Sequence, residues 1–423
     1  MSRLRITVSL AAVLLCVPWT ARADVVLDWN AIAVNTLGAQ AQNPFAQARY
    51  MSIVQLAVFE AVNTITGDYQ PYLGTVVAPV GASADAAAVT AAYRVLRNYF
   101  PAAAATLDPA YATALDAIPS GTARDYGVAT GEDAAAQMIA LRSNDGSAPP
   151  AFYVPESSDV GVWQTTPSCP PSGGLFYHWQ NVTPFGVPSA AGSQDWLAPF
   201  ILPPPPAPTS SRYAKDYKEV KSVGSLNSTT RPADRTDVAR FYAASSPSLI
   251  FNLAARQVAT EKNQSLSQNA RALALINVAS NDALIASFAN KYHYLMWRPE
   301  TAIRAGDLDD NDKTTPDTGF APYIVTPCFP SYPSNHASGS GSAAEMLRRL
   351  YGAGGHRITI ANPAVPGLTF QYTTFKQITD DIDDARVYGG IHFRFDQDGG
   401  NHLARDIATF VYKHNLQRLN VRD

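Results

Sequence analysis

Residues 269–294 place their apolar side chains at the spacing of an α-helix. Leu273, Ile276, Ala279 and Ala283 fall broadly on one side of this segment, as a period of about 3.6 residues per turn requires. It is the clearest element in the chain. A segment of this length and pattern favours a fold whose main units are helices.

Further helical patterns lie on the N-terminal side of this segment. They cover residues 49–64, 83–100 and 122–143, and helical spacing returns near residue 211 and persists to residue 297. Strand patterns are confined to short pieces near 356–372. We therefore predict a mainly α fold, a helical bundle with few short strands.

Residues 149–208 differ in composition from the helical segments before and after them. They contain paired prolines, Gly173-Gly174 and the proline run 203–206. This composition predicts a long irregular connection and not a separate domain. Its many aromatic residues indicate that much of it is ordered and packed over a core: Trp163, Phe176, Tyr177, Trp179, Phe185 and Trp196. We expect an N-terminal helical region at 24–208 and a C-terminal one at 209–423, joined as one globular unit.

Composition and charge exclude some classes of protein. Hydrophobic residues make up 46% and charged residues 16% of the chain, which excludes general disorder. The net charge of −3 lacks the basic excess of a nucleic-acid binder, so no nucleic-acid partner is expected. Any positively charged site must be local and built from a few residues.

The first residues have the pattern of a secretory signal peptide over residues 1–23. Arg3 and Arg5 precede the apolar stretch 6–17, and Ala21-Arg22-Ala23 is a small-x-small cleavage site. An uncleaved anchor is the alternative. No later segment offers about 18 uninterrupted apolar residues, so we expect a secreted protein, periplasmic or extracellular, with no membrane segment after cleavage.

Two cysteines, Cys169 and Cys328, remain once the predicted signal peptide with Cys16 is removed. Export permits a disulfide between them. Two free buried thiols are an equally open alternative. Two cysteines by themselves cannot complete a four-ligand zinc site.

Three segments in the last third carry residues suited to chemistry. In the first, Lys291 and Arg298 lie seven residues apart, so two helical turns bring them to nearly the same face. Their long side chains can converge on one anion, although such a pair by itself is typical of a solvated surface. Pro299 disfavours helical backbone at Arg298, so the helix should end there.

The second segment, residues 329–336, reads as a loop that enters a helix. Ser334 can cap that helix, and the free N–H groups and the helix dipole form a natural oxyanion site beside Asn335 and His336. An ordinary N-cap with a surface histidine is the alternative.

The third segment, residues 386–396, begins with Arg386 and contains His392 and Asp396 four residues apart. An aspartate at that spacing can take the proton of one ring nitrogen and leave the other as a nucleophile or ligand. A core histidine satisfied by its aspartate is the alternative.

The order Lys-x6-Arg-Pro, Pro-Ser-x-His and Arg-x5-His-x3-Asp resembles the signature of the type 2 phosphatidic acid phosphatase superfamily. That superfamily includes vanadium-dependent haloperoxidases and bacterial acid phosphatases. The longer matches, at 297–304, 329–336 and 390–396, resemble the haloperoxidase branch. The resemblance spans most of the chain after residue 23 and is strongest over 270–405. One departure is Asn335, where the branch usually has glycine.

The resemblance implies one bound oxyanion, vanadate, with phosphate able to occupy the same site. It further implies that His392 binds vanadium, Asp396 or a backbone carbonyl orients His392, and His336 is the acid–base group. Hydrogen peroxide and halide would then be the substrates, and hypohalous acid the product. The remaining residues implied to contact the oxyanion are Lys291, Arg298 and Arg386 through their charge, Ser334 through its hydroxyl and Asn335 through its backbone N–H.

Two other functions use the same residues. A secreted acid phosphatase would attack a phosphate ester with His392 to form a phosphohistidine, and His336 would protonate the leaving group. The third possibility is a non-catalytic oxyanion-binding protein. Phe288 and Phe329 match aromatic positions of the chloride-oxidising type and either line a halide site or belong to the core.

Overall fold

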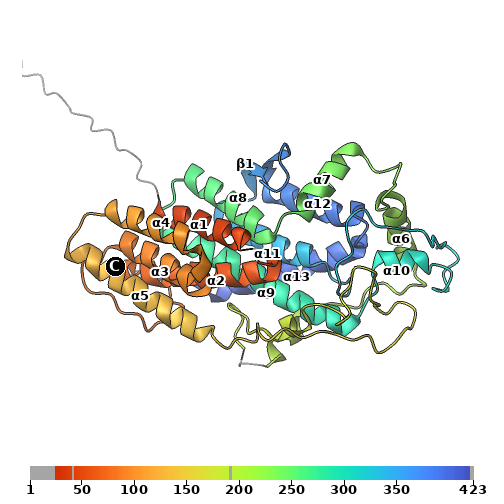
Figure 1. The fold of residues 1–423 in the computed structure, drawn as a ribbon, viewed down its shortest axis with the longest axis horizontal. Helices are drawn as coiled ribbons and strands as arrows, with labels where there is room; N and C mark the ends of the chain where they lie inside the picture. Colours follow the sequence, from red (N-terminus) through yellow and green to blue (C-terminus); the bar gives the residue numbers. More distant parts are fainter. Residues whose placement is uncertain (1–23, 41, 190–192, 420–423) are drawn as a thin grey trace, which may run out of the picture.

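Helices dominate the computed structural model, which describes residues 24–40, 42–189 and 193–419 (Figure 1). The mainly α prediction is confirmed, and the predicted signal peptide at 1–23 lies outside the described residues. The N-terminal elements are α1 (Val25–Ala39), α2 (Pro44–Thr66), α3 (Ala84–Tyr99), η1 (Pro101–Ala103), α4 (Ala104–Asp116) and α5 (Thr122–Leu141). Those that follow the connection are α6 (Ser211–Val223), α7 (Ala233–Ala243), α8 (Pro247–Glu261), α9 (Leu266–Tyr294), α10 (Pro299–Arg304), α11 (Asn335–Tyr351), β1 (Gly354–Ala361), β2 (Thr369–Thr374), α12 (Phe375–Tyr388) and α13 (Arg394–His414).

The predicted helices of the N-terminal half correspond to α2, α3 and α5, whereas α1 and α4 were not predicted. Asn43 caps α2 with its side chain and Pro44 supplies a fixed φ at the first helical position. Ser83 caps α3 in the same manner. The pattern of α4 is obscured by Pro109, which lies inside the helix where proline is normally excluded.

Helix α9 is the centre of the structure. It begins at a capping box in which Ser265 and Gln268 satisfy each other's backbone N–H groups. It packs against α2, α11 and α13, and its residues from Asn269 to Tyr292 are almost all buried. Of the described residues, only α9 is long and apolar enough to cross a bilayer, and its most apolar stretch is wholly buried inside the protein.

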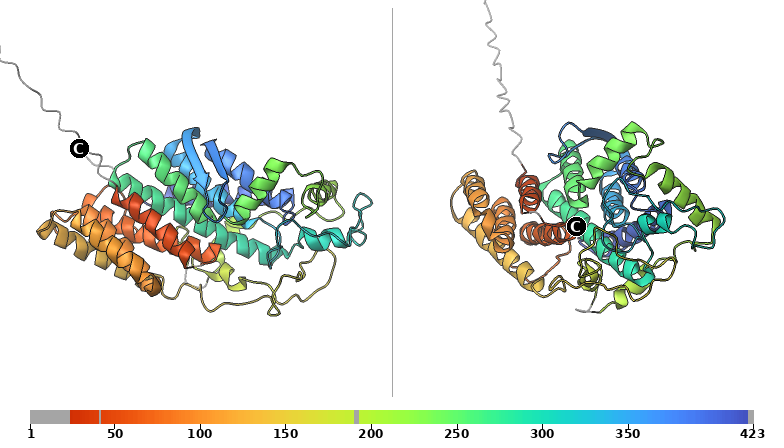
Figure 2. Two further views of the ribbon diagram at one scale, coloured as in Figure 1. Left: turned by 45° about the horizontal axis from the view of Figure 1, so that its top comes forward. Right: turned by 45° about the vertical axis from the view of Figure 1, so that its right-hand side comes forward.

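The only sheet in the described part of the chain is the antiparallel hairpin of β1 and β2. Ile358 pairs with Tyr372 and Ile360 with Phe370, which confirms the short strands predicted near 356–372. The hairpin lies beside α8 (Figure 2). Burial alternates along β1, with Ile358 and Ile360 inside, as expected for a strand that packs one face against the core.

The connection between the halves is irregular, as predicted, and holds two short helical turns, η2 (Tyr177–Asn181) and η3 (Asp195–Phe200). Polar side chains of α9 bind its backbone. Asp282 accepts hydrogen bonds from the N–H groups of Phe185 and Gly186 at 2.8 and 2.7 Å, and Asn290 accepts one from Leu202 at 2.8 Å. These bonds fix the connection along the central helix without regular secondary structure.

A disulfide joins Cys169 of the connection to Cys328, which settles the choice left open by the sequence. Cys328 precedes the loop that leads into α11. The bond closes a separation of 159 residues, and Leu175 donates a backbone hydrogen bond to the Cys328 carbonyl at 2.7 Å. The covalent bond therefore anchors the loop that carries Ser334 and His336.

We predict that replacing both cysteines by serine lowers the free energy of unfolding by roughly 2–5 kcal/mol, because a long loop loses its constraint in the unfolded chain. Chemical denaturation of the variant and of the reduced wild type should give the same lowered midpoint. An unchanged midpoint would show that the bond does not stabilise the fold.

Helices α3 and α5 approach closely at Gly131, where an added Cβ would lie 2.4 Å from the Ala87 carbonyl oxygen. We predict that Gly131→Ala destabilises the protein by about 1–3 kcal/mol through overpacking. Gly38→Ala is the matched control, since nothing lies within 4 Å of its added Cβ. That change should be neutral or stabilising by up to about 1 kcal/mol. Equal melting temperatures for both variants would contradict the close packing.

Candidate active site

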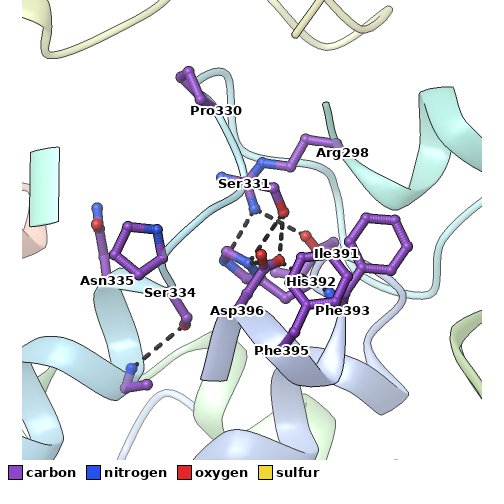
Figure 3. A network of polar contacts seen from close by, with 12 residues as sticks. Arg298, Pro330, Ser331, Ser334, Asn335, Ile391, His392, Phe393, Phe395 and Asp396 are labelled. Carbon is purple, nitrogen blue, oxygen red and sulfur yellow. Dashed lines mark hydrogen bonds and ion pairs between the residues drawn. The ribbon is translucent and has the colours of Figure 1, made fainter. Parts of the chain in front are cut away.

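The three predicted segments converge at one end of α9, where the start of α11 meets the loop before α13 (Figure 3). Arg298 reaches His392, and the Ser334 N–H donates to the Asp396 carbonyl at 2.9 Å. One cavity contacts the predicted residues Asn335, His336, Arg386 and His392. The eight predicted site residues therefore gather in one place: Lys291, Arg298, Ser334, Asn335, His336, Arg386, His392 and Asp396.

His392 is fixed from both sides of its ring. Asp396 Oδ2 lies 2.8 Å from Nδ1, and Arg298 Nη1 lies 3.0 Å from Nε2. A guanidinium only donates hydrogen bonds, so Nε2 must accept and Nδ1 must carry the proton. This arrangement leaves the lone pair of Nε2 directed at the cationic side of the site, as a ligand or nucleophile requires.

Asp396 is held by two donors besides His392. Ser331 Oγ donates to Oδ2 at 2.6 Å and the Phe393 N–H does so at 3.0 Å. Burial raises the pKa of Asp396, while the Ser331 hydrogen bond and the Lys291 charge oppose that rise. Ser331 was not predicted as a site residue, since no pattern in the sequence around it indicates that the loop before α11 contacts Asp396.

Lys291 is fully buried at the end of α9, and its ammonium has three acceptors. It donates to the carbonyl oxygens of Pro330, Ser331 and Pro333 at 2.9, 2.7 and 2.5 Å. An ammonium has three N–H groups, so all of them are used by the loop before α11. Lys291 thus adds positive charge to the site and fixes this loop, and its predicted direct contact with an oxyanion stays a prediction.

The site buries more positive than negative charge. Lys291, Arg298 and Arg386 are 0%, 0% and 3% exposed, while Asp396 is the only carboxylate that pairs within the site. Burial lowers the pKa of Arg298 and of Arg386, yet guanidinium groups stay protonated in proteins. An uncompensated buried charge is costly, so this excess favours binding of an anion.

Several buried donors of the site have no partner among the described residues. They are Arg298 Nη2, Arg386 Nε, Arg386 Nη2 and Asn335 Nδ2. Buried donors are almost always satisfied in native proteins. Four free N–H-bearing atoms beside uncompensated charge are the chemical complement of an oxyanion with several acceptor oxygens.

His336 follows Asn335 in the first turn of α11 and contacts the same cavity. Its surroundings hold the pKa of His336 well below its usual range, first through desolvation and then through the charge of Arg386. A hydrogen bond with the Ser245 backbone acts in the opposite direction. The imidazole is therefore neutral at neutral pH and able to accept a proton.

Apolar side chains from both halves of the chain enclose the cavity, which has a volume of about 50 Å³. Phe329 contacts the cavity, whereas Phe288 packs behind it at 5.4 Å between ring centroids. The contribution of α2 was not predicted from the sequence, because no local pattern links this helix to a motif nearly three hundred residues later. The apolar lining consists of Pro44, Phe45, Pro247, Leu284, Pro327, Phe329 and Ile391.

Fold and site together define a helical-bundle protein with a buried pocket rich in positive charge. Residues 271–421 match the VCPO second helical-bundle domain. A bacterial vanadium-dependent iodoperoxidase superposes with a TM-score of 0.75 at 25% identity, over 94% of this chain and 97% of that one. Vanadium chloroperoxidase from Curvularia inaequalis is 28% identical over 180 residues, which are 36% of this chain and 30% of that relative's length.

A holo-type bacterial vanadium-dependent chloroperoxidase shares the fold, with a TM-score of 0.68 at 17% identity over 88% of this chain and 92% of that one. The likeness to the iodoperoxidase and the match of the C-terminal bundle agree with this fold. The chain is therefore similar to the vanadium haloperoxidases in its fold and in the sequence of its C-terminal bundle.

The excess of buried charge predicts a gain of stability when one cation is removed. Arg386→Met should raise the free energy of unfolding in anion-free buffer by roughly 1–3 kcal/mol. Phosphate should stabilise the wild type, by about 2.7 kcal/mol at a hundredfold excess over its Kd, but not the variant. Arg348→Met, at a surface ion pair with Glu345, should change neither the free energy of unfolding nor its increase with phosphate. If phosphate still stabilised Arg386→Met, that result would contradict an anion site at Arg386.

Proposed function

We propose that this protein is a vanadate-dependent peroxidase that oxidises halide with hydrogen peroxide to hypohalous acid. The observation that carries the proposal is a neutral histidine whose unprotonated Nε2 faces the buried guanidinium of Arg298, beside uncompensated buried cations. A metal-centred oxyanion satisfies both features at once, because it offers oxygens to the cations and a coordination position to the imidazole.

The residues present fit vanadate. The free donors of Arg298, Arg386 and Asn335 would bind its oxygens, together with the Ser334 hydroxyl, whose oxygen already accepts from the Ala337 N–H. His392 would bind the metal through Nε2. When bound, vanadate supplies a Lewis acid that activates hydrogen peroxide towards attack by halide.

The protein's own groups then orient ligands and move protons. Asp396 keeps the Nδ1 proton of His392 in place, so Nε2 stays unprotonated. The overall reaction of hydrogen peroxide with halide takes up one proton and releases hypohalous acid and water. His336, neutral and in the same cavity, would accept a proton from hydrogen peroxide at a ring nitrogen and return it to the departing oxygen.

The small cavity supports the peroxidase over the phosphatase. A volume of about 50 Å³ accommodates only small groups, which suits a small inorganic oxyanion better than one joined to an alcohol. A phosphate ester must also place its alcohol portion among the apolar side chains around Phe45 and Phe329. Inorganic phosphate meets the same donors as vanadate and is expected to compete with it.

We also propose that the protein works outside the cytoplasm. The signal-peptide pattern at residues 1–23 supports export. The Cys169–Cys328 disulfide is of the kind that persists in an oxidising compartment.

The test is a paired assay on the purified protein. One arm contains orthovanadate, hydrogen peroxide and iodide or bromide, and the other contains a chromogenic phosphate monoester without vanadate. We expect oxidised halogen only in the first arm, and inhibition there by phosphate. Ester hydrolysis without halide oxidation would contradict the proposal and favour the phosphatase.

Variants of the His392–Asp396 pair test the assigned roles. His392→Ala should abolish vanadate-dependent turnover. Asp396→Asn should weaken vanadate binding by about ten- to a hundredfold, because an amide can donate to Nδ1 and move the proton to Nε2. Asp406→Asn is the matched control, since Asp406 and His402 repeat the same spacing on α13 at the surface, 3.2 Å apart. Equal losses at positions 396 and 406, or full activity without His392, would contradict these roles.

A further inference from the structure

The side chain of Asn335 has one satisfied atom and one free atom. Asn335 is the first residue of α11, is 4% exposed and lines the cavity beside Arg386 and His392. Its Oδ1 accepts a hydrogen bond from Ser287 Oγ of α9 at 2.6 Å. Its Nδ2 is buried and has no partner among the described residues.

Ser287 determines which way the amide faces. Its side chain is fully buried, and Asn335 is its only hydrogen-bond partner in the described part of the chain. A hydroxyl carries one proton that needs an acceptor. If the amide were turned over, Nδ2 would donate to the Ser287 oxygen, and the hydroxyl proton would have to give up its present acceptor for another one. The stable arrangement therefore leaves the NH₂ group free to bind a ligand.

We propose that the Asn335 side chain is an additional donor to the bound oxyanion and that Ser287 is the positioning residue that aims it. This inference rests on the proposed function, in which the cavity binds a tetrahedral oxyanion. Asn335 then contributes twice, through its backbone N–H at the start of α11 and through Nδ2. The free guanidinium atoms of Arg298 and Arg386 complete the set of donors.

A neutral donor has a specific advantage at this position. The positive charges of Arg386, Lys291 and Arg298 already lower the pKa of His336 and of His392. A fourth cation would lower both further and add to the cost of buried charge. The amide adds a hydrogen bond to the anion without that penalty, and His336 keeps its ability to accept a proton.

The experiment measures the Kd of orthovanadate and of inorganic phosphate by titration calorimetry, without peroxide or halide. Asn335→Ala keeps the backbone N–H and should weaken both anions by about ten- to a hundredfold, the effect of one hydrogen bond to a charged group. Ser287→Ala should weaken them by about two- to tenfold, because the amide then samples both orientations.

The double variant separates a positioning role from general damage. If Ser287 acts only through Asn335, Ser287→Ala in the Asn335→Ala background should have no further effect on either Kd. Ser342→Ala is the matched control, since Ser342 Oγ also joins α11 to α9, by donating to the Ala279 carbonyl at 2.9 Å, but is not among the residues that line the cavity. It should leave both Kd values unchanged, and melting temperatures verify that each variant is folded.

The possible failures are distinguishable. A folded wild type that binds neither vanadate nor phosphate contradicts the proposed function and this inference together. A wild type that binds both anions, with Asn335→Ala binding them equally well, contradicts the inference alone. So does additive loss in the double variant, or a change confined to the KM for iodide in the peroxidase assay, which would make Nδ2 a halide donor.

Discussion

The structure depends on the burial of three cations around a single paired carboxylate. Lys291, Arg298 and Arg386 are almost completely removed from water, and their mutual repulsion is only partly offset by Asp396. Such an arrangement persists only where the surrounding fold over-determines it. All three N–H groups of Lys291 donate to backbone carbonyls. Guanidinium N–H groups of Arg298 and Arg386 have no partner among the described residues. The result is a pocket whose buried charge and unpartnered donors favour binding of an anion.

Helix α9 makes this arrangement possible because it connects the site to the rest of the molecule. It carries Lys291 and Ser287 towards the pocket and uses Asp282 to hold the connection at residues 185–187. The loop before α11 is fixed by Lys291 on one side and by the Cys169–Cys328 disulfide on the other. The N-terminal half adds Phe45 to the pocket wall. The two halves thus share one site and one continuous cluster of buried apolar side chains.

Helical periodicity predicted the helical class and the main helices, because it is a local property. The resemblance of three short motifs to a known family pointed to the eight predicted site residues. The features that were missed are contacts between distant segments. Ser331 reaches Asp396, Ser287 reaches Asn335, and α2 contributes Phe45, none of which leaves a local signal. The use of all three Lys291 donors by carbonyl groups is likewise visible only in three dimensions. Cysteine count left the pairing open, and the close approach of Cys169 and Cys328 decided it.

The central claim is that the unprotonated Nε2 of His392 and the buried cations form one oxyanion site. A crystal of the protein soaked in orthovanadate, with anomalous data collected at the vanadium edge, tests it most directly. The account predicts one strong anomalous peak within coordination distance of His392 Nε2, with oxygens in contact with Arg298, Arg386 and Asn335. A peak elsewhere on the molecule, or a site that stays empty at saturating vanadate, would contradict it.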